Sequence, residues 1–332
     1  MPETPRLTVV IPTYNRVDRL RRVLTALAGQ TVREPFEVVV VSDGSTDGTD
    51  EYLASDALPI DVTAVSQANS GPAVARNRGI ETAGGDLIVF IDDDLVPSPT
   101  MLAEHLAAHD SLGDDVVVIG PMTDPPDHDF SPWTGWEQRM LRKQYDAMER
   151  GDYQATARQF YTGNASVRRE HLLAAGCFDP RFRRMEDLEL AYRLDELGLR
   201  WHFVPAAIGF HYAERSYEAW RQIGHDYGRN DVLFGRDQGH AQVLDMIASG
   251  FERRHVALRL TLRVLLPSPS MAERFQRTVE RFARSRWASA SGRLTAALLS
   301  GAYNEAYYRG VADELGGRDR VWELVGQGRH RG

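Results

Sequence analysis

The stretch Leu87-Ile88-Val89-Phe90-Ile91-Asp92-Asp93-Asp94 joins five apolar residues to three consecutive carboxylates. The apolar part is β-branched and aromatic, which predicts a buried strand over 87–91. Three like charges at a strand end repel one another. A hard divalent cation such as Mg²⁺ or Mn²⁺ prefers carboxylate oxygens and would neutralise them. The alternative is a solvated acidic turn, because turns rich in Asp are common.

Strand and helix signals alternate around this stretch. Apolar runs predict strands at 7–11, 37–41, 62–65 and 115–119, with helices at 20–27, at 72–82 and after Ser98-Pro99. Such alternation favours a parallel α/β sheet, which binds ligands at the carboxyl ends of its strands. We therefore expect one crevice to gather three polar clusters: Pro12-Thr13-Tyr14-Asn15, Ser42-Asp43-Gly44 and Asp92-Asp93-Asp94.

Composition bounds the class of protein. The 332 residues, 42% hydrophobic and 26% charged, are typical of a soluble globular chain long enough for two domains. No apolar run could span a membrane and the N-terminus lacks a signal-peptide pattern, so we expect a cytoplasmic protein. A single cysteine, Cys177, excludes an internal disulfide. The chain has neither Gly-x-Gly-x-x-Gly after its first strand nor a Gly-Lys-Ser/Thr loop, which disfavours a dinucleotide oxidoreductase and a P-loop NTPase.

Charge divides the chain unevenly. The net charge is −8, yet residues 251–332 contain fifteen Arg, no Lys and eight acids. After about residue 213, helical patterns replace the sheet: one helix near Trp220 with a break at 224–230, an aliphatic run over 256–266, and an Arg-rich hairpin over 271–308 with Trp287 on its apolar side. A basic amphipathic region with aromatic residues can lie on an anionic membrane. Alternatively, its arginines are solvated or pair with the acidic first domain. Nucleic acid is disfavoured, because no nucleic-acid-binding motif accompanies the basic charge.

Six motifs, in order over about residues 6–213, resemble family 2 glycosyltransferases with the GT-A fold. They are Val10-Ile11-Pro12-Thr13-Tyr14-Asn15-Arg16, Val41-Ser42-Asp43-Gly44-Ser45-Thr46-Asp47, Ala75-Arg76-Asn77-Arg78-Gly79-Ile80, the Asp triplet, Tyr161-Thr162-Gly163-Asn164-Ala165-Ser166, and Met185-Glu186-Asp187-Leu188-Glu189-Leu190. The resemblance implies a catalytic domain over 1–213, with a nucleotide-sugar half at about 6–120 and an acceptor half at about 121–213. A helical Arg-rich region over 214–332 would follow it.

The resemblance implies an inverting transferase that uses a nucleoside-diphosphate sugar, with UDP or dTDP favoured and GDP open. The acceptor would be a hydroxyl of a glycan, as in polysaccharide biosynthesis, of a lipid-linked saccharide or of a small aglycone. Whether the chain forms a homo-oligomer stays open. The family's nucleotide-binding residues map to eight positions: Pro12, Thr13, Tyr14, Asn15, Asp43, Arg76, Asp92 and Asp93. Asp43 would hold the base, Tyr14 would pack on it, and Arg76 would help hold the base or diphosphate. Asp92 would reach the ribose, and Asp93 is its neighbour in this pocket.

The family's metal motif, Asp-x-Asp, maps onto Asp92 and Asp94. By resemblance Asp94 ligates Mn²⁺ or Mg²⁺ between the two phosphates, Asp92 is a further candidate, and His211 is a third. The alternative for His211 is an ordinary surface or core histidine.

The acidic pair Glu186-Asp187 is the expected catalytic centre. By resemblance Asp187 is the general base, and Glu186 orients the loop or touches the acceptor. Carboxylates at a helix start also stabilise the helix dipole, which is the structural alternative. The family's usual Gly before the pair is Met185 here. Candidates for contact with the sugar or acceptor are Trp133, Trp136, Tyr161, Gly163 and Asn164.

Rival functions remain open at this point. A sugar nucleotidyltransferase would carry a glycine-rich basic loop after the first strand, and Pro12–Arg16 is not one. A catalytically inactive glycan-binding or partner subunit would not need Asp92, Asp94 and Asp187. A retaining transferase shares the fold, which does not determine stereochemistry. Without a Gln-x-x-Arg-Trp signature after the acidic pair, a processive synthase of the cellulose or chitin type is disfavoured.

Overall fold

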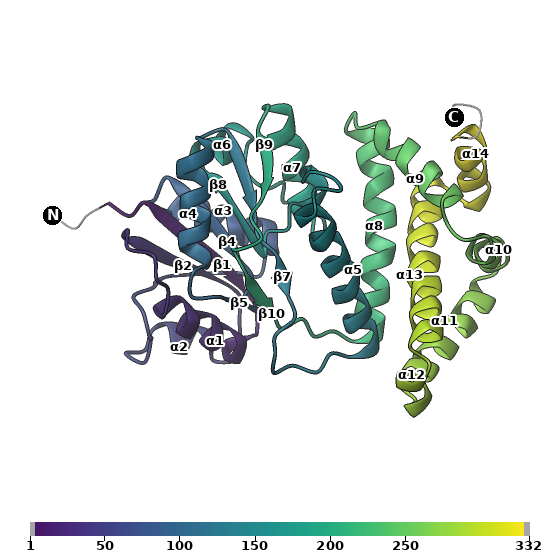
Figure 1. The fold of residues 1–332 in the computed structure, drawn as a ribbon, viewed down its shortest axis with the longest axis horizontal. Coiled ribbons are helices and arrows are strands. Elements are labelled where there is room, and N and C mark those ends of the chain that lie inside the picture. Colours follow the sequence, from purple (N-terminus) through teal and green to yellow (C-terminus); the bar gives the residue numbers. More distant parts are fainter. Residues whose placement is uncertain (1–3, 329–332) are drawn as a thin grey trace. The chain divides into compact units, whose positions relative to one another are not determined.

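The computed structural model describes residues 4–328, apart from the side chains of 289, 290, 327 and 328. The chain divides into two compact units (Figure 1). The first unit comprises the residues up to 128 together with 138–213, and the second comprises 129–137 together with the residues from 214 on. Helix α5 (Pro132–Glu149) begins in the second unit and continues in the first.

A seven-stranded sheet forms the centre of the first unit, in the order β3-β2-β1-β4-β8-β6-β9. Its strands are β1 (Leu7–Thr13), β2 (Phe36–Asp43), β3 (Thr63–Gln67), β4 (Leu87–Ile91), β6 (Val116–Ile119), β8 (Asn164–Arg168) and β9 (Arg200–Phe203). The pairs among β1, β2, β3 and β4 are parallel, as predicted, and so is β6 with β9. Strand β8 runs antiparallel to both β4 and β6. It starts at the carboxyl end of β4, where Asn164 lies opposite Ile91. Gly163 therefore lies next to Asp92.

A second, three-stranded sheet brings the end of the first unit back to the acidic triplet. Strand β10 (Gly209–His211) pairs antiparallel with β5 (Leu95–Pro97) and parallel with β7 (Met122–Thr123). Its register places His211 opposite Leu95, the residue after Asp94. Backbone pairing thus fixes the approach of His211 to the metal motif.

The helices of the first unit cover the large sheet. They are α1 (Val17–Ala28), α2 (Thr49–Leu53), α3 (Pro72–Thr82), α4 (Met101–Leu112), α6 (Arg169–Ala174) and α7 (Glu186–Glu196), with a short 3₁₀ turn, η1 (Ala157–Gln159). Helix α1 buries Leu20, Val23, Leu24 and Leu27, the apolar stripe that the sequence predicted. Its N-cap is Arg16, and the side chain of Asp47 accepts the Val17 N–H at 2.9 Å. Asp47 is thus a capping residue.

The second unit is helical: α8 (Tyr217–Asp237), α9 (Gln242–Glu252), α10 (Val256–Leu265), α11 (Pro269–Ala283), α12 (Arg286–Ala290), α13 (Gly292–Leu315) and α14 (Arg318–Gly328). Helices α8 and α13 pack side by side (Figure 1). The break expected at 224–230 is wrong, because α8 is continuous and turns Gly224 and Gly228 toward α13. Trp287, expected on the apolar side of the hairpin, lies in α12 with its side chain 61% exposed.

Within the described residues, no helix has both the length and the apolar composition needed to cross a bilayer.

Candidate functional site

The three polar clusters at the ends of β1, β2 and β4 lie together, as the sequence predicted. The Thr13 hydroxyl donates to Asp93 at 2.8 Å, which joins the end of β1 to the end of β4. Asn15, in a left-handed conformation, accepts the Thr46 N–H at 2.7 Å, which joins β1 to the loop after β2. One edge of the sheet therefore carries all three clusters.

Asp93 faces inward from the triplet. It is buried and accepts from Thr13 and from Arg16 at 2.8 Å. Burial raises the pKa of Asp93 to about 6, although the charge of Arg16 opposes the rise. These contacts within the protein tie the triplet to the end of β1.

Asp94 is surrounded by cationic and imidazole groups. Arg16 and Arg19 each donate to its carboxylate at 3.2 Å, and Nε2 of His211 lies 3.6 Å from it. Burial opposes ionisation here, but His211 and the two arginines hold the pKa of Asp94 well below its usual range. Arg16 was part of a sequence motif without an assigned role, and Arg19 was not singled out. Arg16 is the N-cap of α1 and Arg19 lies in its first turn, so the close spacing of two arginines at a helix start was the available signal.

Asp94 and His211 fit a divalent cation as a two-residue protein site. Among the described residues, no group of three or more His, Cys, Asp or Glu side chains is close enough to hold a metal. Mg²⁺ is commonly held by one or two carboxylates together with substrate phosphates and water, so two protein ligands suffice. The side chain of Asp92, about one-third exposed, forms an ion pair with Arg76.

Gln138 of α5 supports this fit. Its amide nitrogen lies 3.0 Å from Nδ1 of His211, while its buried Oε1 has no hydrogen-bond partner. A half-turn of the carboxamide would let Oε1 accept a hydrogen bond from an Nδ1–H group. That tautomer leaves Nε2 with a bare lone pair beside Asp94, as a metal-binding histidine requires.

One buried guanidinium links the nucleotide side of the site to the acidic pair. Arg76 of α3 donates from one terminal nitrogen to Asp92 and from the other to Glu186, both at 2.7 Å. Only 5% of Arg76 is exposed, and its ring neighbour is Phe178. The structure therefore brings the triplet and the pair together, although 94 residues of sequence separate Asp92 from Glu186. The predicted contact of Arg76 with base or diphosphate stays a prediction.

Asp187 lies in the first turn of α7, beside Glu186. Its carboxylate accepts the N–H of Leu188 at 2.8 Å. Burial and the negative charge of Glu186 raise the pKa of Asp187 to about 7, against the opposing charge of Arg76. Met185 precedes the pair with φ of 59°, the left-handed region that favours glycine, so this position explains the family's usual Gly.

Asp43 and Tyr14, the two residues expected to bind the base, differ in exposure. The buried carboxylate of Asp43 accepts from Gln67 at 2.7 Å and from the N–H groups of Ser70 and Gly71 at 2.8 Å each. A carboxylate has about four acceptor sites, so one remains for a ligand. Tyr14 is about half exposed, and its ring is accessible for stacking.

The candidate acceptor residues fall into two groups. Gly163 is a close-approach position, because an added Cβ would lie 3.1 Å from a carboxylate oxygen of Asp92. Tyr161 is partly buried in the first unit, and Asn164 is fully buried, bonding to Pro121, Ala207 and His105. Direct acceptor contact by Asn164 stays a prediction that this burial disfavours.

Trp133 and Trp136 belong to the second unit. They are 4% and 8% exposed and pack in its core with Tyr217, Trp220 and Tyr303. Sugar stacking on either indole stays a prediction that this packing disfavours.

The family model described as "Glycosyl transferase family 2" matches residues 8–175, just over half of the chain. The match includes the triplet and Arg76, whereas Asp187 and His211 lie beyond it.

Among curated proteins, the chain is 34% identical over 224 residues to a validoxylamine A glucosyltransferase of Streptomyces hygroscopicus subsp. jinggangensis, which covers 59% of this chain and 52% of that protein. It is 28% identical over 254 residues to the uncharacterized glycosyltransferase YfnE of Bacillus subtilis, with 62% and 64% covered. The matches thus span between about half and two thirds of these relatives.

Solved structures share the fold. The mannosyltransferase PcManGT of Pyrobaculum calidifontis, in complex with GDP-Man and Mn²⁺, superposes with a TM-score of 0.59 at 21% identity, covering 92% of this chain and 88% of that chain. TarS 1-349 of S. aureus, in complex with UDP-GlcNAc, gives 0.51 at 17% identity, with 94% and 92% covered. At these identities the likeness establishes a GT-A fold with a C-terminal helical region.

Proposed function

This chain belongs to glycosyl transferase family 2. We propose that it transfers a sugar from a nucleotide sugar to an acceptor hydroxyl with inversion at the anomeric carbon, with Asp187 as general base. One observation carries this proposal. A single buried guanidinium, that of Arg76, joins Asp92 on the nucleotide side to Glu186, the neighbour of the proposed base. This contact supports a single site for donor and base, as a direct displacement requires.

Asp187 has the properties of a base that works near neutral pH. Its carboxyl has a pKa of about 7, so it can take a proton from an acceptor hydroxyl and still be ionised in an appreciable fraction of molecules. The proton passes from the hydroxyl to Asp187 as the oxygen attacks the anomeric carbon. The bond from that carbon to the diphosphate breaks on the opposite face. Glu186 holds Arg76 and is placed to orient the loop.

On the donor side, Asp43 and Tyr14 support recognition of a base. The remaining acceptor site of Asp43 suits the imide N–H of uracil or thymine, which favours UDP- and dTDP-sugars. Stacking on Tyr14 suits any base, so GDP-sugars are also candidate donors. Pro12, Thr13 and Asn15 shape the loop beneath, and Asp92 is the candidate for the ribose.

Asp94 and His211 are the residues that would hold Mn²⁺ or Mg²⁺. The cation, when bound, offsets charge on the departing diphosphate. Arg16 and Arg19 add positive charge beside Asp94, and they are placed to bind phosphate oxygens directly.

The acceptor is a glycan, a lipid-linked saccharide or a small aglycone. One relative is named validoxylamine A glucosyltransferase, and others are named chondroitin synthase and hyaluronan synthase. These names support testing both small-molecule and polysaccharide acceptors. We also propose a cytoplasmic protein with peripheral membrane contact through its C-terminal region.

The test combines donor and base. UDP-, dTDP- and GDP-sugars are incubated with Mn²⁺ or Mg²⁺, and hydrolysis and transfer to a panel of acceptors are measured for the wild type, Asp94→Ala, Asp187→Asn and the control Glu196→Gln. Glu196 is an exposed acid on the same helix as Asp187. We expect Asp187→Asn to lose at least about 100-fold in kcat while still binding the nucleotide, and Glu196→Gln to match the wild type.

Each rival predicts another pattern. A nucleotidyltransferase would make a sugar nucleotide from a sugar phosphate and a nucleoside triphosphate. An inactive glycan-binding subunit would show no turnover with any donor, and a retaining enzyme would give a product of the same anomeric configuration as the donor. Full transfer by Asp187→Asn would refute the base assignment.

A further inference from the structure

Large apolar side chains are exposed mainly in one segment of the second unit. Of the eleven exposed large hydrophobic residues described, six lie within residues 256–294. They are Val256, Leu260, Val264, Met271, Trp287 and Leu294. Three of the six belong to one helix, α10, and exposed apolar residues that share one face mark an interaction site more often than scattered single residues do.

The positive charge of the C-terminal region is concentrated in the same segment. Residues 253–294 contain ten Arg and only two acids, Glu273 and Glu280. Residues 253–272 contain four Arg and no acid at all. Of these four, Arg259 pairs with Glu252 at 2.7 Å. The surplus charge around α10 therefore comes from Arg253, Arg254 and Arg263.

Helix α10 has two aliphatic faces. Leu262, Leu265 and Leu266 are buried against the rest of the second unit. Val256, Leu260 and Val264 are 56%, 57% and 54% exposed, and their i, i+4, i+8 spacing places them along one outer line about 12 Å long. We call this line the α10 ridge. A folded unit that only needed a core would not require it.

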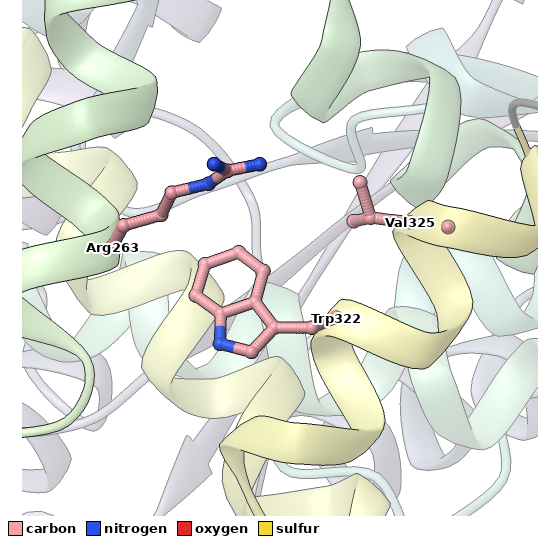
Figure 2. A pocket seen from close by; sticks show the side chains of 4 residues that line it. Arg263, Trp322 and Val325 are labelled. Atoms are coloured by element: carbon pink, nitrogen blue, oxygen red, sulfur yellow. The ribbon is translucent and has the colours of Figure 1, made fainter.

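A groove with an aromatic wall adjoins the ridge. Its volume is about 390 Å³, and Arg263, Trp322, Val325 and Gly326 line it. Figure 2 shows Arg263 and Trp322 extending from their helices toward the space between them. The guanidinium carbon lies 5.9 Å from the indole centroid. A cationic group beside an indole and an aliphatic floor suits an amphipathic ligand with a phosphate head.

We propose that the α10 ridge, flanked by Arg253 and Arg263, docks on the surface of an anionic lipid bilayer. The ridge would enter the boundary between head groups and acyl chains, and the arginines would bind lipid phosphates. This inference sharpens the peripheral contact proposed above, and its test does not depend on transferase activity.

Charge argues against the other occupants. A two-fold contact with a second copy would bring the ridge arginines of one copy toward those of the other, and like charges facing each other are destabilising. Nucleic acid would bind the arginines but would leave the aliphatic ridge in water. A bilayer with anionic head groups meets both needs.

The experiment is vesicle co-sedimentation of the full chain without nucleotide. Vesicles of phosphatidylcholine alone are compared with vesicles that also contain phosphatidylglycerol. We expect binding only to the anionic vesicles, weakening as salt rises. Arg253→Gln with Arg263→Gln should lower the partition coefficient about 30-fold, since each arginine near an anionic surface contributes about fivefold. Combined Val256→Ser, Leu260→Ser and Val264→Ser should lower it at least about tenfold.

The control is Leu173→Ser combined with Leu197→Ser, at two leucines of the first unit that are each 47% exposed. This variant should bind vesicles as the wild type does. All substituted side chains are exposed, and thermal unfolding checks that each variant is folded. Equal binding to both vesicle types, no binding at all, or unchanged binding of the serine variant would overturn the proposal. A wild-type dimer that the serine variant dissociates would assign the ridge to a second copy and overturn it as well. A chain that binds vesicles but transfers no sugar would refute the proposed function alone.

Discussion

Asp187 is the residue whose protonation controls the proposed reaction. Its pKa, raised to about 7 by burial and by the charge of Glu186, lies far above that of an ordinary aspartate. Only the ionised carboxylate can accept a proton. We therefore expect kcat/KM to rise about tenfold per pH unit below pH 7 and to level off above it, measured as initial transfer rates between about pH 5 and pH 9.

Glu186→Gln tests the cause of that shift. The substitution removes the charge that opposes ionisation of Asp187, so the midpoint of the pH profile should move to lower pH. Glu196→Gln, on the same helix, should leave the midpoint unchanged. A midpoint that stays in place in Glu186→Gln contradicts the assignment of the profile to Asp187.

Gln138 is the residue we expect to set the tautomer of His211. Gln138→Leu removes the amide beside Nδ1, so the imidazole loses its orientation and Mn²⁺ should bind at least about tenfold more weakly. Calorimetric titration of Mn²⁺ into the protein with UDP measures this without turnover. Gln154→Leu, at an exposed position, serves as the control. Unchanged Mn²⁺ affinity in Gln138→Leu would refute the role of Gln138 in orienting His211.

At the scale of elements, local patterns predicted most of the helices and the parallel pairing of the N-terminal strands, but missed β8 and the continuity of α8. Residues 72–82 form α3 with the predicted bounds, because Pro72 starts the helix and Gly84-Gly85 follow its end. Strand β8 was not predicted, and composition would not have given its antiparallel direction, since a buried strand has the same composition in either direction. The two glycines of α8 predicted a break, because glycine weakens an isolated helix. Their contact with α13 exists only in the folded chain.

Gly228 tests this contact between α8 and α13. A Cβ at Gly228 would lie 1.9 Å from the carbonyl oxygen of Tyr307, and one at Gly310 would lie 1.9 Å from that of His225. Gly228→Ala should therefore lower the free energy of unfolding by about 1–3 kcal/mol, since the two helices must move apart. Urea unfolding followed by circular dichroism measures the change.

Gly250 provides the matched control for that substitution. It lies in α9 of the same unit, and the nearest atom to its added Cβ is 4.0 Å away. Gly250→Ala should be neutral or should stabilise by up to about 1 kcal/mol. If both alanine variants gain stability, the close approach of α8 and α13 is not a constraint on the fold.

At the scale of the whole molecule, the sequence indicated which residues gather but not how they are held. The ends of three parallel strands predicted that Thr13, Asp43 and Asp94 share one edge. By contrast, Arg16 reaches Asp94 through a turn, and Gln138 reaches His211 from α5. The spacing of Arg16 and Arg19 pointed only weakly to the first contact, and no spacing in the chain encodes the second. The basic surplus of the C-terminal region was visible in composition, whereas its coincidence with the exposed α10 ridge required the folded helix.

Hydrogen exchange of the full chain should separate the two proposed surfaces. UDP with Mn²⁺ should slow amide exchange at the strand ends, in residues 13–16, 43–47 and 92–94, because a ligand that binds only the folded state suppresses local opening. It should leave residues 253–266 unchanged, since the α10 ridge has no part in nucleotide binding. Anionic vesicles should give the reverse pattern. If the nucleotide instead slowed exchange in 253–266 alone, the donor site would not lie at the acidic triplet. If vesicles slowed exchange only at the strand ends, the bilayer would not dock on α10.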